Sequence, residues 1–341
     1  MAVTKTKPTK LSVKSLPGKA GLSKNLRRHK GGLKQCLYLN KLADIDLLRV
    51  PICLLVLLGA FHRVGAEDIA GTFSVPPGAK TFYVGKIRAT VLHDGRYIEA
   101  NDGKSFGVDA GATAVGEVLR AAGLPTDRIT LSVNTLLVHS GRRVLLLDTG
   151  LGIKDHGVML ASLKVAGVSP AAVTDVLITH SHGDHIGGLV DATGHLAFPK
   201  ATVRMAIAEW DWFQKQGPAQ IVGLIANHVR TFAPGARIAP GVTSVALTGH
   251  TPGHVGSEIA SGSSRMLDIG DLAHSSIISL QKPLWTNAYD NDAAAGKAIR
   301  QQTLGRLAQD RELVFSPHFP YPGIGHIVST GDGFTWMPQA P

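Results

Sequence analysis

Four side chains that bind metals well lie within six positions of the chain: His180, His182, Asp184 and His185. Imidazole nitrogen suits zinc and related transition metals, and a carboxylate adds a hard oxygen ligand. The alternative is a solvated polar loop. The apolar segment 176–178 argues against it, because a run of this kind is typical of a buried strand and leads directly into the cluster. Buried polar groups without partners are costly, so the pattern predicts a metal centre.

The elements around this cluster alternate between strand-like and helix-like segments, which is typical of an α/β domain. His180 and His182 are two apart, a spacing that puts both side chains on one face at the end of a strand. Asp184 and His185 are expected in the turn that opens the next helix. We see no internal repeat and no second linker, so one domain is predicted over 67–341. The predicted strands are 81–92, 131–138, 143–148, 176–179, 242–247, 265–269 and 312–316, with helices at 206–216 and 293–308 and a helical turn at 169–173.

The spacing His-x-His-x-Asp-His resembles the signature of the metallo-β-lactamase superfamily. Further landmarks follow in the order of that family, over about Leu131 to Ile327. They are Asp148 at a strand end, His250 and His254 in the segment 248–254, Asp271 after Gly270, and His318 in the segment 316–320. The resemblance implies a four-layer αββα sandwich with a dinuclear site at one edge, at the ends of the strands.

The same resemblance implies a ligand set for two divalent metal ions, zinc in the first place, with manganese, cobalt or iron as alternatives. Asp271 would bridge the two ions, and Asp148 would support the metal histidines. His254 would either be structural or support the ligands. A hydroxide held by the metals would be the nucleophile, and Asp184 would also accept or donate a proton. The first metal would be held by His180, His182 and His250, and the second by Asp184, His185 and His318.

Residue types separate the branches of this family. A glutamate in place of His182 would suit a di-iron oxygen-reducing site, and a cysteine in place of Asp271 would indicate one class of zinc β-lactamase. Nucleases of the family carry an extra domain, and glyoxalase II-type thioesterases add a helical C-terminal domain, whereas 23 residues follow His318 here. The lactonase, arylesterase and organophosphate hydrolase branch remains.

Within that branch, the segments 270–274, 289–292 and 318–326 resemble the methyl parathion hydrolase-like group. This implies hydrolysis of a small-molecule lactone, aryl ester or phosphotriester. Two enzymatic alternatives stay open, a zinc β-lactamase and a sulfur dioxygenase with a single iron on the same fold. A non-catalytic metal-binding or interaction protein is the third alternative.

Charge is distributed unevenly along the chain. The net charge of +10 would favour nucleic-acid binding, but residues 1–66 contain 13 of the 35 basic residues and 2 of the 25 acidic ones. The remainder, with 22 basic and 23 acidic residues, is close to neutral. We therefore expect no nucleic-acid partner. A homodimer is left open.

Residues 1–66 are interpreted as a basic leader that contains a signal peptide or an uncleaved anchor. A charged Arg49, an apolar run of twelve over 50–61 and the small residues 64–66 form this pattern. A buried core helix is the alternative for 50–61. Cys36 and Cys53 both lie in the leader, so the body contains neither a disulfide nor a thiolate ligand. A periplasmic or secreted protein is expected, without stable membrane insertion once the leader is removed.

Aromatic residues could line an apolar substrate pocket, or could be ordinary core residues. His274 and His326 are interpreted as structural, with orientation of the ligands as the alternative. The aromatic candidates are Trp210, Trp212, Phe213, Trp285 and Tyr321.

Overall fold

The computed structural model describes residues 70–340. The predicted leader, with its apolar run and both cysteines, lies outside the described residues. None of the helices within 70–340 combines the length and the apolar character needed to cross a membrane.

The first of two β-sheets has eight strands in the order β1-β3-β4-β5-β6-β7-β8, with β2 paired to β3. Neighbouring strands are antiparallel from β1 to β5 and parallel from β5 to β8. The strands are β1 (Gly71–Phe73), β2 (Gly78–Val84), β3 (Ile87–Ala100), β4 (Arg128–Ser140), β5 (Arg143–Leu147), β6 (Asp175–Leu177), β7 (Thr202–Ala206) and β8 (Val229–Phe232).

The second sheet has seven strands in the order β15-β14-β13-β12-β11-β10-β9. All its neighbours are antiparallel except β12 and β13, which α7 (Ala293–Asp310) connects as a parallel pair. The strands are β9 (Arg237–Ala239), β10 (Val242–Ala246), β11 (Val255–Ser261), β12 (Ser264–Asp268), β13 (Leu313–Phe315), β14 (Ile324–Thr330) and β15 (Gly333–Pro338).

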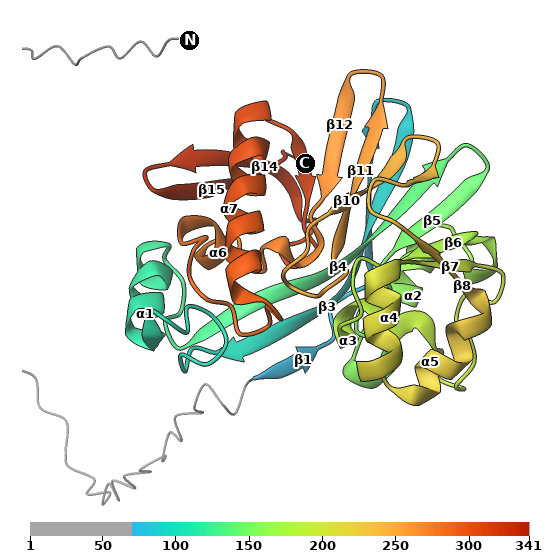
Figure 1. Cartoon of the computed structure of the whole chain (residues 1–341), viewed down its shortest axis with the longest axis horizontal. Helices are drawn as coiled ribbons and strands as arrows, with labels where there is room; N and C mark the ends of the chain where they lie inside the picture. The colour runs from blue at the N-terminus through green and yellow to red at the C-terminus, as the bar shows by residue number, and fades with distance from the viewer. Residues whose placement is uncertain (1–69, 341) are drawn as a thin grey trace, which may run out of the picture. The chain divides into compact units, whose positions relative to one another are not determined.

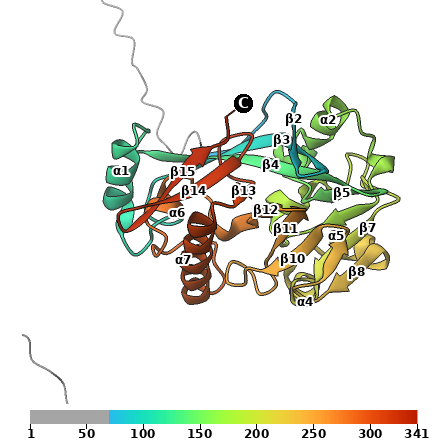
Figure 2. The ribbon, with the colours of Figure 1, turned by 90° about the horizontal axis from the view of Figure 1, so that it is seen from above.

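The two sheets pack face to face and helices cover their outer faces (Figures 1 and 2). Leu136 and Val138 of the first sheet share one core with Val242 and Phe315 of the second. Outside the first sheet lie α2 (Met159–Val165), α4 (Ile207–Gln216) and α5 (Ala219–Ile225). Outside the second lie α6 (Ile278–Gln281) and α7, while α1 (Gly111–Ala121) packs on the projecting end of β4. The predicted four-layer αββα sandwich is confirmed.

Two predicted elements were wrong in detail. The predicted strand 81–92 is a hairpin, because the chain turns at Gly85 with φ of +57° between β2 and β3. The predicted strand 176–179 ends at Leu177, since Thr179 donates its backbone N–H to the carboxylate of Asp148 instead of to a neighbouring strand. His180 and His182 therefore lie in a loop, and the argument from one strand face does not apply to them.

Candidate metal centre

The seven predicted metal ligands converge between the two sheets, at the ends of strands. The first sheet contributes the loop after β6 and the short helix α3 (Gly183–Ile186), whose N-terminal turn contains Asp184 and His185. The second sheet contributes His250, Asp271 and His318, which follow β10, β12 and β13 respectively. Residues that are up to 138 positions apart in the sequence, from His180 to His318, thus meet in one place.

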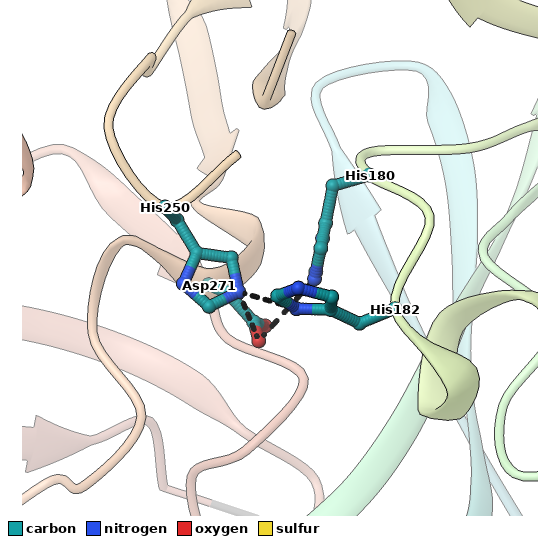
Figure 3. Close-up of side chains that lie close together, drawn as sticks. All are labelled: His180, His182, His250 and Asp271. Atoms are coloured by element: carbon teal, nitrogen blue, oxygen red, sulfur yellow. Dashed lines mark hydrogen bonds and ion pairs between the residues drawn. The ribbon is translucent and has the colours of Figure 1, made fainter. Parts of the chain in front are cut away.

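One group of ligand atoms comes from His180, His182, His250 and Asp271, whose side chains point toward one another (Figure 3). These atoms all lie within 4.8 Å of one another. His182 Nδ1 is 2.9 Å from His250 Nε2, and His180 Nε2 is 3.6 Å from Asp271 Oδ2. Three nitrogens and one oxygen at such separations form a donor set suited to zinc.

A second group contains Asp184, His185 and His318, and Asp271 lies between the two groups. Asp271 Oδ1 is 3.2 Å from His185 Nε2 and 3.1 Å from His318 Nε2. Its other oxygen, Oδ2, faces the first group, at 3.4 Å from His250 Nε2. Asp271 therefore presents one oxygen to each group, as a bridging carboxylate requires.

The chemistry of these atoms fits two cations. Within residues 70–340, the buried atoms His180 Nε2, His185 Nε2, His318 Nε2 and Asp271 Oδ1 have no hydrogen-bond partner. Buried polar atoms are nearly always satisfied, so four unsatisfied lone-pair donors in one place indicate that a bound species completes the site. The other nitrogens of these histidines are all occupied, which leaves the inner lone pairs for metal.

Hydrogen bonds on the outer side fix how the ligand imidazoles are oriented. His185 Nδ1 lies 2.8 Å from Asp148 Oδ2, which confirms the predicted position of Asp148. His250 Nδ1 lies 3.2 Å from Asp290 Oδ1, and His318 Nδ1 donates to the carbonyl of Ser132 at 2.9 Å. In the neutral form of each ring the hydrogen therefore lies on the outward Nδ1, and the inner Nε2 keeps the lone pair that binds metal.

His254 accepts a hydrogen bond from the backbone of Asp271 and belongs to neither group of candidate ligand atoms, which agrees with the predicted structural or supporting role. Its Nδ1 donates to the carbonyl of Leu247 at 2.9 Å, so its Nε2 is free to accept the backbone N–H of Asp271 at 3.1 Å. Burial lowers the pKa of His254 to about 3, so it stays neutral. Gly270 adopts φ of +46°, and a Cβ atom there would press on the His254 ring.

The surroundings of His180, His182 and Asp271 favour the charge states that bind cations. Burial, reinforced by His250, lowers the pKa of His182 to about 4. Burial and the neighbouring His185 lower the pKa of His180 well below its ordinary value. Burial alone would raise the pKa of Asp271, but His185 and the other surrounding imidazoles outweigh it and hold that pKa well below the usual range. The carboxylate of Asp271 is therefore ionised, and His180 and His182 offer lone pairs.

Sequence reasoning missed Glu209, a fully buried carboxylate on α4. Its Oε1 accepts from the backbone N–H and hydroxyl of Ser181, at 2.7 and 2.6 Å. Its Oε2 accepts from the hydroxyl of Thr251 at 2.6 Å and the backbone N–H of Gly253 at 3.1 Å. Ser181 and Thr251 each adjoin ligand histidines, so Glu209 joins the two loops that hold the first group.

A cavity of about 370 Å³ opens over the ligands. Its floor includes Asp184, Asp271 and His318, and its walls include Tyr97, Leu131, Leu151, His274 and Tyr289. None of the predicted aromatic residues lines it. Phe213 and Trp210 pack into the core beneath α4, and Tyr321 stacks on His93. Trp212 comes nearest, with its ring centroid 6.0 Å from that of His182, while Trp285 packs beside α1.

Comparison with known proteins identifies the family. The model of the metallo-beta-lactamase superfamily matches residues 128–330, a range that holds all seven converging residues. This chain belongs to the metallo-β-lactamase superfamily. The membership inferred from His-x-His-x-Asp-His is thereby confirmed.

Solved structures similar to this metallo-β-lactamase-fold protein include AidC, a dizinc quorum-quenching lactonase in complex with the product N-hexanoyl-L-homoserine. It is 28% identical, with a TM-score of 0.73 over 77% of this chain and 98% of that chain. The hydrolase AbOPH is 27% identical, with a TM-score of 0.71 over 77% of this chain and 98% of that chain. The structural similarity to this chain extends over nearly the whole length of both proteins.

A curated relative is the atrochrysone carboxyl ACP thioesterase of Aspergillus terreus, which is 40% identical over 76 residues. The match covers 22% of this chain and 23% of that protein, so the chain spans about a quarter of the length of this relative.

Proposed function

We propose that this protein hydrolyses a lactone, with two zinc ions bound by the seven converging residues. The main support for the proposal is the cavity. Predicted metal ligands line its base, and Tyr97, Leu131, Leu151 and Tyr289 line its sides. A largely apolar cavity with a few convergent polar groups is typical of small-molecule sites. The similarity to a dizinc lactonase over 98% of that chain supports the same substrate class.

The seven residues divide the binding of the ions as the two groups suggest. His180, His182 and His250 would hold one ion, Asp184, His185 and His318 would hold the other, and Asp271 would contribute a carboxylate oxygen to each. Bound zinc supplies Lewis acidity, which acidifies water and stabilises negative charge on an attacked oxygen. The chain itself keeps the imidazole lone pairs aimed inward through Asp148, Asp290 and the carbonyl of Ser132.

Asp184 is the residue to which we assign proton movement. Its side chain is 31% exposed and lines the cavity, whereas that of Asp271 is 3% exposed. Burial raises the pKa of Asp184, but His185 and His318 outweigh it and lower that pKa below its ordinary value. Oδ2 of Asp184 faces His185 and His318, so the ionised carboxylate can take a proton from water at Oδ1 and return it to the ring oxygen as the lactone opens.

Initial rates on a panel of substrates test this proposal. The purified, zinc-loaded protein is given N-hexanoyl-homoserine lactone, an aromatic lactone, a nitrophenyl acetate, a nitrophenyl phosphotriester, an acyl thioester and a cephalosporin, each with a chelated control. Chelator-sensitive turnover of a lactone at a kcat/KM at least about tenfold above the others is expected. Faster turnover of the aryl ester or the phosphotriester would make the protein an arylesterase or an organophosphate hydrolase instead of a lactonase. Preference for the cephalosporin would favour the β-lactamase alternative and refute the lactonase proposal.

Metal analysis separates the proposal from a sulfur dioxygenase. Two zinc ions per chain with full activity are expected. One iron per chain, with oxygen consumption on a persulfide substrate, would contradict both the zinc pair and the hydrolytic role.

We also propose that the protein is exported to the periplasm or secreted. The apolar run 50–61, flanked by Arg49 and the small residues 64–66, supports this. Intact-mass measurement on protein from an extracytoplasmic fraction should find a chain that begins near residue 67. Full-length protein confined to the cytoplasm would refute export.

A further inference from the structure

His274 lies in the wall of the cavity, close enough to the centre to be taken for another metal ligand. Its Nε2 is 3.0 Å from Asp271 Oδ2, and it forms a third group of ligand-type atoms with Asp271 and His318 within 4.8 Å. The side chain is buried, with its ring parallel to that of His318 at 5.4 Å between centroids and an angle of 6°. Distance alone therefore does not decide whether it binds a cation or serves another purpose.

The position of its ring hydrogen follows from Asn287. His274 Nδ1 is 3.0 Å from Asn287 Nδ2. The amide of Asn287 cannot be turned over, because its Oδ1 accepts the backbone N–H of Tyr289 at 3.1 Å. An amide nitrogen only donates, so Nδ1 of His274 must accept and the hydrogen of the neutral ring sits on Nε2. The nitrogen that faces the cavity is thus an N–H.

Four of the five candidate ligand histidines have the opposite arrangement. His185, His250 and His318 face a carboxylate or a carbonyl with Nδ1, so their hydrogen lies outside and Nε2 offers a lone pair. The hydroxyl of Thr179 donates to Asp148 and can therefore accept from Nδ1 of His180. An imidazole that carries N–H toward the centre has no lone pair there for a metal.

We infer that His274 is a hydrogen-bond donor to the reacting oxygen of the substrate, held in that tautomer by Asn287, and not a metal ligand. The inference rests on the proposed lactonase function for the identity of that oxygen. Because the ligand-type atoms of Asp271, His274 and His318 lie within 4.8 Å of one another, an oxygen that enters among them comes within reach of the Nε2–H. The buried Asn287 keeps the donor in place before the substrate arrives.

The chemistry requires such a donor at one step. Water adds its oxygen to the carbonyl carbon of the lactone, the ring C–O bond breaks, and one proton from water ends on the former ring oxygen to give a hydroxy acid. Before the ring bond breaks, the carbonyl oxygen carries negative charge. His274 donates a hydrogen bond to that oxygen and keeps its proton throughout, so no other reactant is needed. Donors of this kind contribute about 10²–10³ in kcat.

The test compares His274→Phe, which removes the donor, with His274→Gln, which restores an N–H. His318→Gln serves as a variant that loses a ligand, and His326→Phe as a control from a separate cavity lined by Glu258 and Arg306. We expect His274→Phe to bind two zinc ions with affinity within about threefold of wild type, and His318→Gln to lose affinity for one. His274→Phe should lower kcat about 10²–10³-fold with little change in KM, and His274→Gln should recover at least about tenfold of that loss.

Nitrogen NMR of the zinc-loaded protein gives a readout that does not depend on any substrate. The His274 signals, assigned by their absence in His274→Gln, should show hydrogen on Nε2, and those of His185 should show hydrogen on Nδ1. Hydrogen on Nδ1 of His274, loss of one zinc ion in His274→Phe, or a kcat within threefold of wild type in that variant would each overturn the inference. If the wild type turns over another substrate instead of lactones, the proposed function fails, and the same variants test the donor on that substrate.

Discussion

Replacement of Glu209 by glutamine perturbs the connection between the two loops that hold the first group of ligands. The wild-type carboxylate accepts four hydrogen bonds, two from Ser181 and one each from Thr251 and Gly253. Glutamine has one oxygen that can accept, and its amide nitrogen must itself find an acceptor. The hydroxyls of Ser181 and Thr251 can rotate to accept, but a backbone N–H cannot. Either Ser181 or Gly253 is therefore left with a buried donor that has no partner.

The expected loss of stability follows from the hydrogen bonds that glutamine cannot make. A buried, unpaired N–H costs about 1–3 kcal/mol, and a hydrogen bond to a charged group contributes about 1.5–3 kcal/mol. We expect Glu209→Gln to lower the free energy of unfolding by about 2–4 kcal/mol, which is a fall of several degrees in the melting temperature for a domain of this size. Because outer hydrogen bonds orient metal ligands, zinc affinity should fall about 10–100-fold.

Denaturant unfolding of the metal-free protein and competition with a chromophoric chelator measure the two effects separately. Glu117→Gln is the matched control, since Glu117 is 63% exposed in an ion pair with Arg120 on α1. Exposed pairs of this kind contribute about 0–1 kcal/mol, and the control should keep its zinc affinity. The reasoning is refuted if Glu209→Gln unfolds at the same denaturant concentration as the control and binds zinc as tightly as wild type.

Three further results are expected. Replacing His182 by alanine should remove turnover while circular dichroism stays that of the wild type, because the residue lies in a loop; full activity in this variant would place the site elsewhere. Excess chelator should abolish hydrolysis and zinc should restore it, whereas activity that survives complete metal removal contradicts a metal-dependent reaction. Burial raises the pKa of Asp94 to about 6, although it accepts the backbone N–H groups of Leu151 and Met159. The folded state therefore favours the protonated form of Asp94. The difference in unfolding free energy between the wild type and Asp94→Asn should shift against the wild type by about 2–3 kcal/mol from pH 4 to pH 7. A difference that does not change with pH would show that the pKa of Asp94 is not raised.

The first four ligand positions could be predicted because these residues lie close together in the sequence and their side chains are types that bind metals. His180, His182, Asp184 and His185 are neighbours in the sequence, and their types alone suit a metal. The more distant Asp271 was reached through the resemblance to a family order and not through any local pattern. Nothing in the spacing of the sequence places Asp271 opposite the first cluster, since it arrives on the second sheet after β12.

Residues that support the site depend on tertiary contacts and gave no signal of their own. Asp290 is 40 positions from His250, and Glu209 is 28 positions from Ser181 on a helix whose pattern was interpreted through its aromatic residues. Helical spacing correctly placed Phe213 on a buried face, but that face packs on the first sheet. The residues that line the cavity include Tyr97 on β3 and Tyr289 in the loop between α6 and α7, so their proximity exists only in the folded chain.

The location of the site at the seam of the sandwich couples metal binding to the packing of the two sheets. His185 and Asp148 come from the first sheet and Asp271 and His318 from the second, so bound cations connect the two halves of the fold. Without cations, the seam contains buried atoms that lack partners, and these disfavour close approach of the sheets. Each tenfold excess of free zinc over its dissociation constant adds about 1.4 kcal/mol to the unfolding free energy. The strands that end at the seam should therefore gain more protection from hydrogen exchange on zinc binding than α1, which packs at the far end of β4.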